Sequence, residues 1–448
     1  MASRTGRLFV TSLITGCLVA AAPAQPDPYQ AITAFVGVTV LPMDKETVVP
    51  NQTVIVREQK IAWMGSADAA TIPANAARVD GKGKFLMPGL AEMHAHIPGG
   101  KAPDSAIHRT LFLYVANGVT TIRGMLGEPR HLSYRSSVAN GAVLGPRIFT
   151  TGPSFNGNTA PTREAAVEAV IAQKKAGFDL LKIHPGVPRD AFDALAAKAH
   201  ELKIPFAGHV PADVGLQRAL DARYRSIDHL DGYVEALAKP GTPSQFFGVN
   251  LMTQVDESGI PALVKATRAA GVWQVPTEVL LDNLLNDETA DALAARPEMK
   301  YVIQQSDIQS WMKQREQFQK IPQAERKRLL TIRRRLIKDM HDAGVPFALG
   351  SDAPQMWNVP GFSIHRELQS MIDAGLTPYQ ALKTGTTNVG LYFGTTDGVV
   401  AAGRRADLVL LDANPLQAIA NSSKIAGVMV NGRWLSKADI DARLAASH

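Results

Sequence analysis

The 448-residue sequence predicts an α/β protein in which a (β/α)8 TIM-type barrel carries a small β-sandwich domain built from both chain ends. Three observations predict this fold class. Short apolar runs alternate with amphipathic helical stretches through the middle of the chain, five of those helical stretches close on a glycine, and β-rich segments of similar texture lie at both ends. Such an order is typical of a parallel sheet covered by helices, with a separate all-β unit beside it.

The strands of the barrel are expected where apolar runs of four to six residues recur. These runs lie near Leu90, Thr120, Ile148, Leu181, Ala207, Ile227, Gln274 and Ala348. Eight strand-then-helix units fit a (β/α)8 barrel, which we place at residues 88–395. An open doubly wound sheet is the alternative, but the chain has no G-x-G-x-x-G and no G-x-x-x-x-G-K-[ST] loop.

The helices of the barrel are expected to end at glycines, because the residue that closes a helix often adopts a left-handed backbone conformation. Five positions fit this pattern: Gly118, Gly177, Gly271, Gly344 and Gly375. After the first four, the next apolar strand begins at once.

The small domain is expected from β-branched runs at both ends of the chain. Residues 31–87 hold three such runs separated by turns, and residues 396–441 repeat the texture, for example at 407–411 (DLVLL). Because the termini of a domain often lie close together, the two pieces can complete one β-sandwich.

Composition excludes several classes of function. With 46% hydrophobic and 20% charged residues, the chain can bury a large core and is not disordered. Its 1 Cys rules out a disulfide framework and a thiolate zinc finger. The formal charge of +6 is too small for a nucleic-acid partner, so we expect a small-molecule substrate. The oligomeric state stays open, a homo-oligomer included.

One basic segment resembles a nucleic-acid site at first sight. Residues 326–338 hold seven basic side chains, but apolar residues recur among and just after them at spacings of three and four. We therefore interpret the segment as an amphipathic helix with a solvated basic face.

Residues 1–24 are expected to be a signal peptide. Arg4 and Arg7 precede an apolar run, and an A-x-A cleavage site ends at Ala24. We therefore expect an exported protein, periplasmic or secreted, with no transmembrane segment after signal removal. A lipoprotein signal with acylated Cys17 is the alternative, although the apolar run continues past that residue.

Metal-binding side chains gather at the predicted carboxyl ends of the barrel strands, which is the face that carries active sites. His94 and His96 end the first strand, and side chains two residues apart on a strand point the same way, so both can reach one ion. Further candidates end later strands, namely Lys182, His209, His229 and Asp352. Imidazole and carboxylate groups suit zinc or a similar divalent cation.

These motifs resemble the metal-dependent amidohydrolase superfamily, especially its imidazolonepropionase-like and Xaa-Pro dipeptidase-like branch. The similar segments are 88–96 (PGLAEMHAH), 340–352 (MHDAGVPFALGSD), 374–382 (AGLTPYQAL) and 402–409 (AGRRADLV). The likeness runs from Ala31 to Leu435.

The resemblance implies a site for two divalent metal ions, with zinc as the first choice. The ligands would be His94, His96 and Asp352 for the more buried ion, and His209 and His229 for the more exposed one. Lys182, carboxylated by carbon dioxide, would bridge the ions, because a free ammonium group offers only donors. A surface lysine, a substrate-binding lysine and a Schiff-base lysine are the alternatives for this residue.

The reaction that the resemblance implies is hydrolysis of an amide C–N bond, with dipeptides or N-acyl amino acids as substrates. Two cations about 3.5–4 Å apart would acidify a bridging water to hydroxide, and Asp352 would act as general base and pass the proton to the leaving amine. Two other hypotheses remain. One is a mononuclear cyclic-amide hydrolase with Lys182 as a plain amine and His229 as the acid–base group, and the other is a non-catalytic exported metal-binding protein.

The sequence indicates substrate-binding residues less clearly than metal ligands. Arg123 either holds a substrate carboxylate or forms a structural ion pair, and Tyr233 is a candidate for touching the scissile carbonyl. The chain also departs from the family pattern at Glu92, Gly124 and 156–158 (NGN). Of these residues, Glu92 is expected to orient a metal ligand.

Overall fold

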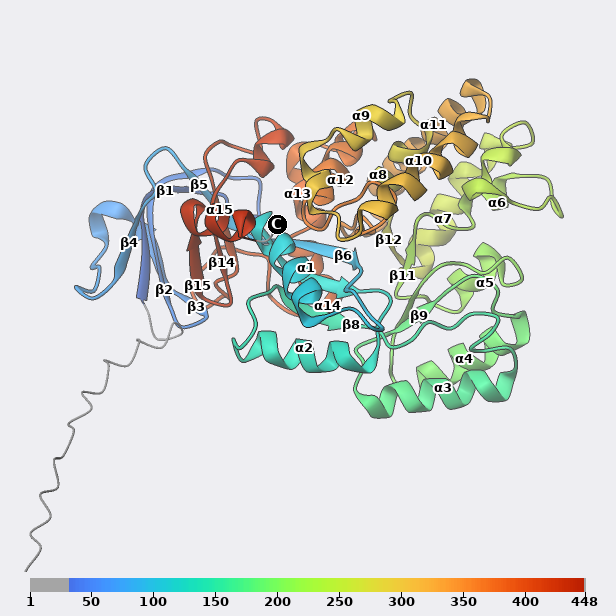
Figure 1. Ribbon diagram of the computed structural model, residues 1–448, viewed down its shortest axis with the longest axis horizontal. Coiled ribbons are helices and arrows are strands. Elements are labelled where there is room, and N and C mark those ends of the chain that lie inside the picture. The colour runs from blue at the N-terminus through green and yellow to red at the C-terminus, as the bar shows by residue number, and fades with distance from the viewer. Residues whose placement is uncertain (1–31, 447–448) are drawn as a thin grey trace, which may run out of the picture.

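The computed structural model describes residues 32–446, apart from the side chain of Phe246. The predicted signal peptide, with Cys17, lies outside the described residues. None of the described helices is long and apolar enough to cross a membrane. Figure 1 shows a β-rich part at one end of the molecule and a larger part rich in helices at the other.

The β-rich part is one eight-stranded sheet that both chain ends build. Its order is β15-β14-β13-β5-β1-β2-β3, and β4 also pairs with β1. The strands are β1 (Ile32–Val40), β2 (Val49–Arg57), β3 (Lys60–Ser66), β4 (Ala77–Asp80), β5 (Phe85–Pro88), β13 (Leu408–Leu411), β14 (Ile425–Val430) and β15 (Arg433–Ser436). Strand β5 joins the two ends, since it pairs parallel with β1 and antiparallel with β13. The two β-rich ends therefore build one sheet.

Apolar side chains are buried on both faces of this sheet, because the side chains along each strand alternate between the two faces. In β2, Val54 and Val56 face one apolar cluster with Phe35 and Leu410, whereas Ile55 faces another. Successive side chains of a strand point to opposite faces, so the TVIV run supplies both clusters at once.

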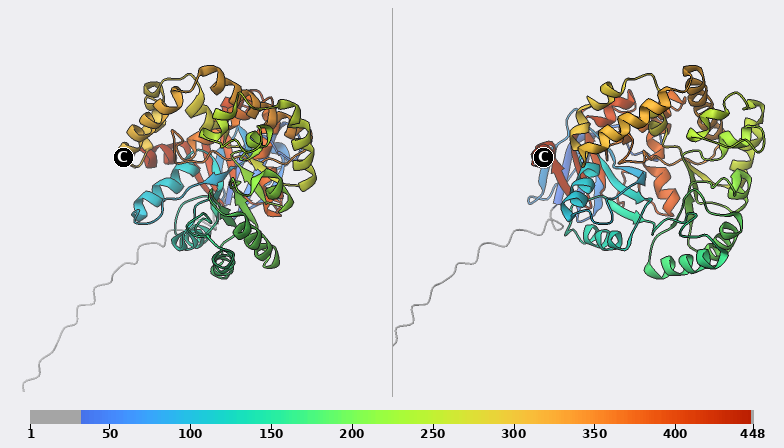
Figure 2. Two further views of the ribbon diagram at one scale, coloured as in Figure 1. Left: turned by 90° about the vertical axis from the view of Figure 1, so that its right-hand side faces the viewer. Right: turned by 45° about the vertical axis from the view of Figure 1, so that its right-hand side comes forward.

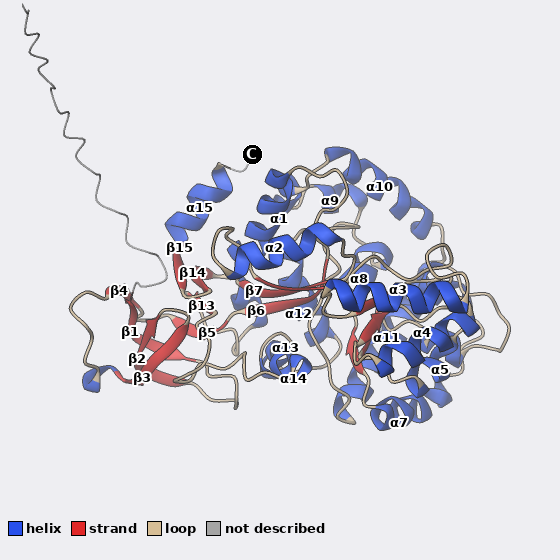
Figure 3. Ribbon diagram, turned by 90° about the horizontal axis from the view of Figure 1, so that it is seen from below, coloured by secondary structure: helices blue, strands red, loops and turns tan. Residues whose placement is uncertain are grey.

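The larger part holds two parallel sheets, which appear as red arrows among the helices in Figure 3. One has the order β6-β7-β8 and the other β12-β11-β10-β9. The strands are β6 (Leu90–Ala95), β7 (Val119–Gly124), β8 (Arg147–Thr150), β9 (Leu181–Ile183), β10 (Phe206–Gly208), β11 (Ser226–Asp228) and β12 (Trp273–Val275). Every residue of β6 is buried, as expected for a parallel strand with helices outside it.

Isolated parallel bridges link these two sheets on both sides. Thr151 pairs with Leu180, which joins the end of β8 to the start of β9. On the other side Phe347 pairs with Gln274 of β12, and Ala353 pairs with Ala95 of β6, so the segment 347–353 connects the sheets. This segment carries the eighth predicted strand.

The α-helices lie around the outside of these strands, as the two views of Figure 2 show, except the last one, which packs against β14 and β15 of the eight-stranded sheet. They are α1 (Asp104–Ala116), α2 (Pro129–Ala139), α3 (Arg163–Ala176), α4 (Arg189–Glu201), α5 (Gly215–Asp221), α6 (Tyr233–Leu237), α7 (Ile260–Ala270), α8 (Glu278–Leu285), α9 (Ala290–Ala294), α10 (Gln305–Gln319), α11 (Gln323–Asp342), α12 (Phe362–Asp373), α13 (Pro378–Thr384), α14 (Thr387–Phe393) and α15 (Lys437–Ala445). The short 3₁₀ helices are η1 (Ala67–Ala69), η2 (Phe246–Leu251), η3 (Glu257–Gly259), η4 (Pro297–Tyr301) and η5 (Ile419–Ser423). The five predicted helix-closing glycines all have positive φ, from +67° to +97°, which confirms that prediction.

Helix α11 corrects one expectation about the basic segment. Its apolar stripe is buried as predicted, but its basic side chains are not all solvated. Arg326 and Arg333 are buried too. Arg326 donates to the carbonyl oxygens of Leu285 and Asn286, and Arg333 donates to the carboxylate of Glu278. The spacing of basic residues along a helix does not distinguish an arginine that faces solvent from one that donates hydrogen bonds to buried carbonyl or carboxylate oxygens.

Candidate metal centre

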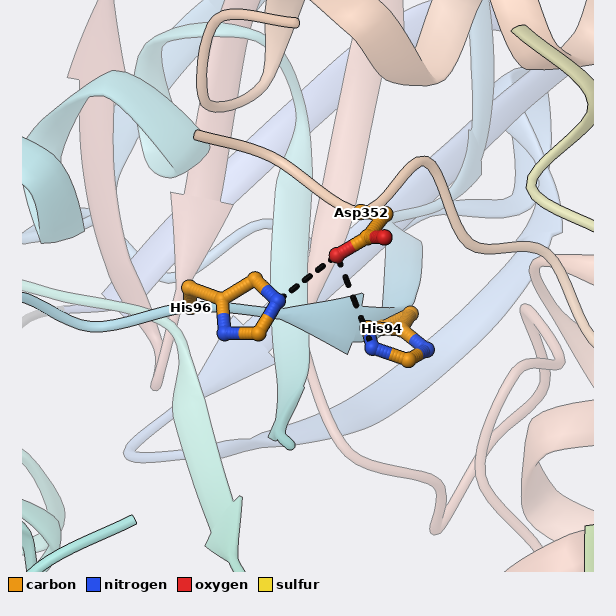
Figure 4. A group of neighbouring side chains, drawn as sticks. All are labelled: His94, His96 and Asp352. Atoms are coloured by element: carbon orange, nitrogen blue, oxygen red, sulfur yellow. Dashed lines mark hydrogen bonds and ion pairs between the residues drawn. The ribbon is translucent and has the colours of Figure 1, made fainter. Parts of the chain in front are cut away.

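Three predicted ligands converge where β6 and the segment 347–353 end (Figure 4). The Oδ1 atom of Asp352 lies 2.6 Å from His96 Nε2 and 3.5 Å from His94 Nε2. One ligand atom from each of the three residues lies within 4.8 Å of the others, which is close enough for one cation to bind all three. His94 and Asp352 are buried and His96 is half-buried, so the group opens toward solvent on the side of His96.

Lys182 reaches the same point from β9. Its Nζ atom lies 3.2 Å from His94 Nε2, and its side chain is buried. Burial lowers the pKa of Lys182, because removal from water disfavours the ammonium form. The sequence alternative of a surface lysine is therefore wrong.

His209 and His229 complete the cluster from the ends of β10 and β11. The ring centroids of His94 and His229 are 4.6 Å apart, and those of His209 and His229 are 4.5 Å apart. His229 Nδ1 also lies 3.7 Å from Asp352 Oδ2. The structure thus brings all six residues predicted as ligands into one cluster.

The donor set of this cluster fits a divalent cation. His229 Nε2 is buried and has no hydrogen-bond partner among the described residues, which is costly for a nitrogen unless a ligand binds it. The neighbouring donors are imidazoles and a carboxylate, the groups that zinc prefers. The pKa of Asp352, which burial raises and His94 and His96 lower, stands at about 2, so its carboxylate is ionised at neutral pH.

Acidic residues and a threonine fix the free nitrogens of the histidines. His209 Nδ1 forms a hydrogen bond with Asp231 Oδ2 (2.6 Å) and His229 Nδ1 one with Thr277 Oγ1 (2.7 Å), whereas His94 Nδ1 lies 2.9 Å from Asp228 Oδ2 at ion-pair distance without hydrogen-bond geometry. Such partners set the tautomer and ring orientation of a metal ligand. These three partners were not among the residues predicted from the sequence, although Asp228 and Asp231 flank His229 in the motif DHLD.

Glu92 holds the backbone of two ligand segments together. Its Oε1 atom accepts hydrogen bonds from the backbone N–H of His94 (2.9 Å) and of Ser351 (2.7 Å). Burial raises the pKa of Glu92 to about 8. The expectation that Glu92 orients ligands agrees with these contacts.

Arg123 forms the structural ion pair and not the substrate contact. It is fully buried, and its Nη2 atom donates to both carboxylate oxygens of Asp228 at 3.1 Å. Its Nη1 atom donates to Ser226 and Tyr392. This corrects the prediction of substrate binding, because protein groups use the donors that a carboxylate would need.

Tyr233 is also corrected as a substrate contact. Its side chain is fully buried, and its hydroxyl lies 2.8 Å from Thr267 Oγ1 of α7. Tyr233 is close to His229 along the chain, but as the first residue of α6 its ring points into the core.

Strained backbone marks the cluster. His229, Thr277 and Asp352 have φ values of +63°, +49° and +64°. Non-glycine residues adopt this region uncommonly, and such strain gathers at functional sites. His184, two residues beyond Lys182, lies beside the cluster with its ring centroid 4.9 Å from that of His209.

The chain belongs to the amidohydrolase family, whose sequence model matches residues 85–435. This confirms the resemblance drawn from the sequence motifs. Two curated relatives are imidazolonepropionases. The protein of Mycolicibacterium smegmatis is 29% identical over 106 residues, which is 23% of this chain and 26% of that protein. The protein of Saccharopolyspora erythraea is 25% identical over 168 residues, or 35% of this chain and 42% of that protein. The matches thus span less than half the length of these relatives.

Solved structures resemble the whole fold. A protein assigned as a prolidase from Bifidobacterium longum has a TM-score of 0.69 at 24% identity, covering 94% of this chain and all of that one (100%). Bottromycin amidohydrolase has a TM-score of 0.71 at 23% identity, covering 95% and 94%. A Xaa-Pro dipeptidase with bound methionine has a TM-score of 0.65 at 16% identity, covering 91% and 100%. These likenesses show a shared α/β fold.

Proposed function

We propose that this chain is an exported, metal-dependent hydrolase that cleaves amide C–N bonds of dipeptides or N-acyl amino acids. The observation that carries the proposal is the convergence of the six candidate ligands, from His94 to Asp352, in one largely buried cluster. The names of the structural neighbours, which include a prolidase and a Xaa-Pro dipeptidase, support this substrate class.

The proposal includes the finer architecture expected from the sequence. The two parallel sheets, with the bridges at Thr151 and Phe347, would form the (β/α)8 barrel, and the eight-stranded sheet would form the β-sandwich domain. The predicted domain bounds, 31–87 with 396–441 and 88–395, belong to the same proposal.

The proposed chemistry assigns a proton-transfer role to Asp352. Bound divalent cations, zinc first, would supply Lewis acidity and lower the pKa of a water. Asp352 can take up the proton of that water at Oδ2, because Oδ1 faces His96 and His94. The same carboxyl group then gives the proton to the leaving nitrogen, and it ends in its starting ionised form.

Lys182 would take part as a carbamate. Burial favours its uncharged amine, and only that form has the lone pair that attacks carbon dioxide. A C–N bond forms, one proton leaves, and the product is an anionic group with two oxygen ligands. Its oxygens would serve as ligands to the two proposed ions.

A second candidate function is a mononuclear cyclic-amide hydrolase. Two observations favour it: one close triad of ligand atoms stands out among the described residues, and the relatives matched by sequence are imidazolonepropionases. In that reaction Lys182 would stay an amine and His229 would serve as the acid–base group.

One experiment separates these functions. The purified mature chain is loaded with Zn²⁺, its metal content is measured, and dipeptides, N-acyl amino acids and cyclic amides are tested for hydrolysis. Two ions per chain with cleavage of linear amides supports the first function. One ion with cleavage of cyclic amides supports the second, and bound metal without any metal-dependent hydrolysis contradicts both.

A further inference from the structure

Arg333 of α11 points toward the candidate metal centre although its helix lies outside the strands. Its Nη1 atom donates to the backbone oxygen of His229 (2.8 Å), and its Nη2 atom donates to that of Pro276 (3.3 Å). Its Nε atom donates to the carboxylate of Glu278 (2.9 Å). Arg333 is 2% exposed and Glu278 is fully buried, so water does not compete for these contacts.

The two carbonyl groups that Arg333 binds belong to strained loops. His229 and the following Leu230 have φ values of +63° and +54°, and Thr277, which follows Pro276, has a φ of +49°. A positive φ is a true outlier for a β-branched residue such as Thr277. Strained backbone of this kind persists only where surrounding contacts determine it.

These loops also hold each other through side chains. Thr277 Oγ1 lies 2.7 Å from His229 Nδ1. The loop after β12, which carries Thr277, therefore fixes the imidazole ring of His229 in the loop after β11. The opposite nitrogen of that ring, Nε2, is buried without a hydrogen-bond partner among the described residues. The ring itself lies beside His94, with centroids 4.6 Å apart.

An arginine is specifically suited to this contact. Its planar guanidinium presents several donors at fixed angles, whereas lysine offers one flexible ammonium group. Glu278 begins α8 and supplies the compensating negative charge. Removal of either partner would leave the other charge buried.

We propose that Arg333, held by Glu278, is a positioning residue that sets the orientation of His229 as a metal ligand. The inference rests on the proposed function, because it requires that His229 binds metal. It assigns a role to one arginine of the basic segment that the proposed function leaves unused.

The test is Co²⁺ binding to the full mature chain, followed by the visible absorption spectrum and by titration against a chelator. Arg333→Lys keeps the charge but loses the planar set of separate donors, Nε, Nη1 and Nη2, that contacts the three acceptors. We expect it to bind the ion at His229 about 10–100-fold more weakly than the wild type, with an altered spectrum, as for other partners of metal ligands. The ion at His94, His96 and Asp352 should stay. The matched control is Arg335→Lys on the same helix, where Arg335 is exposed and pairs with Glu257.

His229→Asn separates a failure of this inference from a failure of the proposed function. Loss of an ion in His229→Asn with wild-type Co²⁺ binding and spectrum in Arg333→Lys overturns the inference alone. Unchanged Co²⁺ binding in His229→Asn removes His229 from the ligand set and overturns both the inference and the two-metal form of the proposed function. If circular dichroism shows that Arg333→Lys is unfolded, Glu278→Gln replaces it, since Gln keeps the shape and an oxygen acceptor. Wild-type Co²⁺ affinity in Glu278→Gln then overturns the inference.

Discussion

Lys182 is buried, with its Nζ atom 3.2 Å from His94 Nε2, and removal from water disfavours the ammonium form of its side chain. As a carbamate it would supply oxygen ligands, which an ammonium cannot do. We expect Lys182→Ala to lose turnover together with at least one bound ion, and added short-chain carboxylates to restore part of both. Metal content and rate are measured on one sample, with the exposed Lys175→Ala as control. Full metal content and wild-type turnover would contradict the bridging role.

Arg123 and Asp228 form a buried pair behind His94, so the loss of one partner leaves an uncompensated charge. We expect Arg123→Met to lower the free energy of unfolding by about 3–5 kcal/mol. The control, Arg135→Met, breaks the partly exposed pair with Asp179 and should cost about 0–1 kcal/mol. Urea unfolding of the metal-free proteins measures both. A raised KM with unchanged unfolding energy in Arg123→Met would instead favour substrate binding.

At this scale the sequence predicts the ligands but not their partners. His94 and His96 could be assigned because a strand places alternate residues on one side and barrels use one face. The partners Asp228 and Thr277 could not, because their contacts join different strands and depend on the exact rotation of each ring. The role of Arg123 was ambiguous because residue type alone does not separate an arginine in a buried ion pair from an arginine that binds substrate.

Helix α12 is anchored through the half-buried imidazole of His365. One ring nitrogen lies 2.9 Å from Ser422 Oγ and the other 3.2 Å from the backbone oxygen of Asn117, so the ring links α12 to η5 and to the end of α1. Burial lowers the pKa of His365 to about 4 from the ordinary histidine value of 6.5. The folded protein therefore holds this ring neutral at pH values where the unfolded chain protonates it.

The sign of the pH dependence follows from that difference. Because the folded-state pKa is the lower one, the contribution of His365 is fully present above pH 6.5 and is lost as the pH falls toward 4. The loss is worth about 3 kcal/mol at most. We expect His365→Gln to unfold with a weaker pH dependence than the wild type across this window, whereas exposed His108→Gln should match it. If the free energy of unfolding depended on pH equally in the wild type and in His365→Gln, the role assigned to His365 would be contradicted.

Elements were predicted best where local chemistry decides them. Gly118 and Gly344 close helices because a left-handed residue satisfies the last carbonyl groups without a Cβ penalty, and that requirement is visible in sequence. The basic face of α11 was predicted less well. The buried positions of Arg326 and Arg333 depend on carbonyl groups and a carboxylate from α8 and its neighbouring loops, which no local pattern records.

At the scale of the whole molecule, the two chain ends share one core. Leu410 from the C-terminal part is buried against Phe35 and Leu86 from the N-terminal part. We expect Leu410→Ala to lower the free energy of unfolding by about 2–5 kcal/mol. The control Val48→Ala, at a side chain that is 46% exposed, should change it by less than about 0.5 kcal/mol. Equal, small effects at both positions would contradict a shared core.

The pairing of the chain ends could be predicted from texture, because β-branched runs at both ends need partners. The order of the strands could not, since no local pattern records that β1 pairs parallel with β5, or that β5 pairs antiparallel with β13 across the whole length of the chain, as Phe85 does with Leu411. The motifs nevertheless placed all six ligand candidates at one site.

Asp352 gives the most direct test of the proposed function, because it separates catalysis from metal storage. Asp352→Asn keeps the shape and one ligand oxygen but cannot accept a proton. Turnover and metal content are measured on the same metal-saturated sample. General acid–base catalysis is worth about 10²–10⁴-fold, so we expect the metal-replete variant to lose at least about 100-fold in rate. A metal-replete Asp352→Asn enzyme within about tenfold of the wild-type rate would contradict the account.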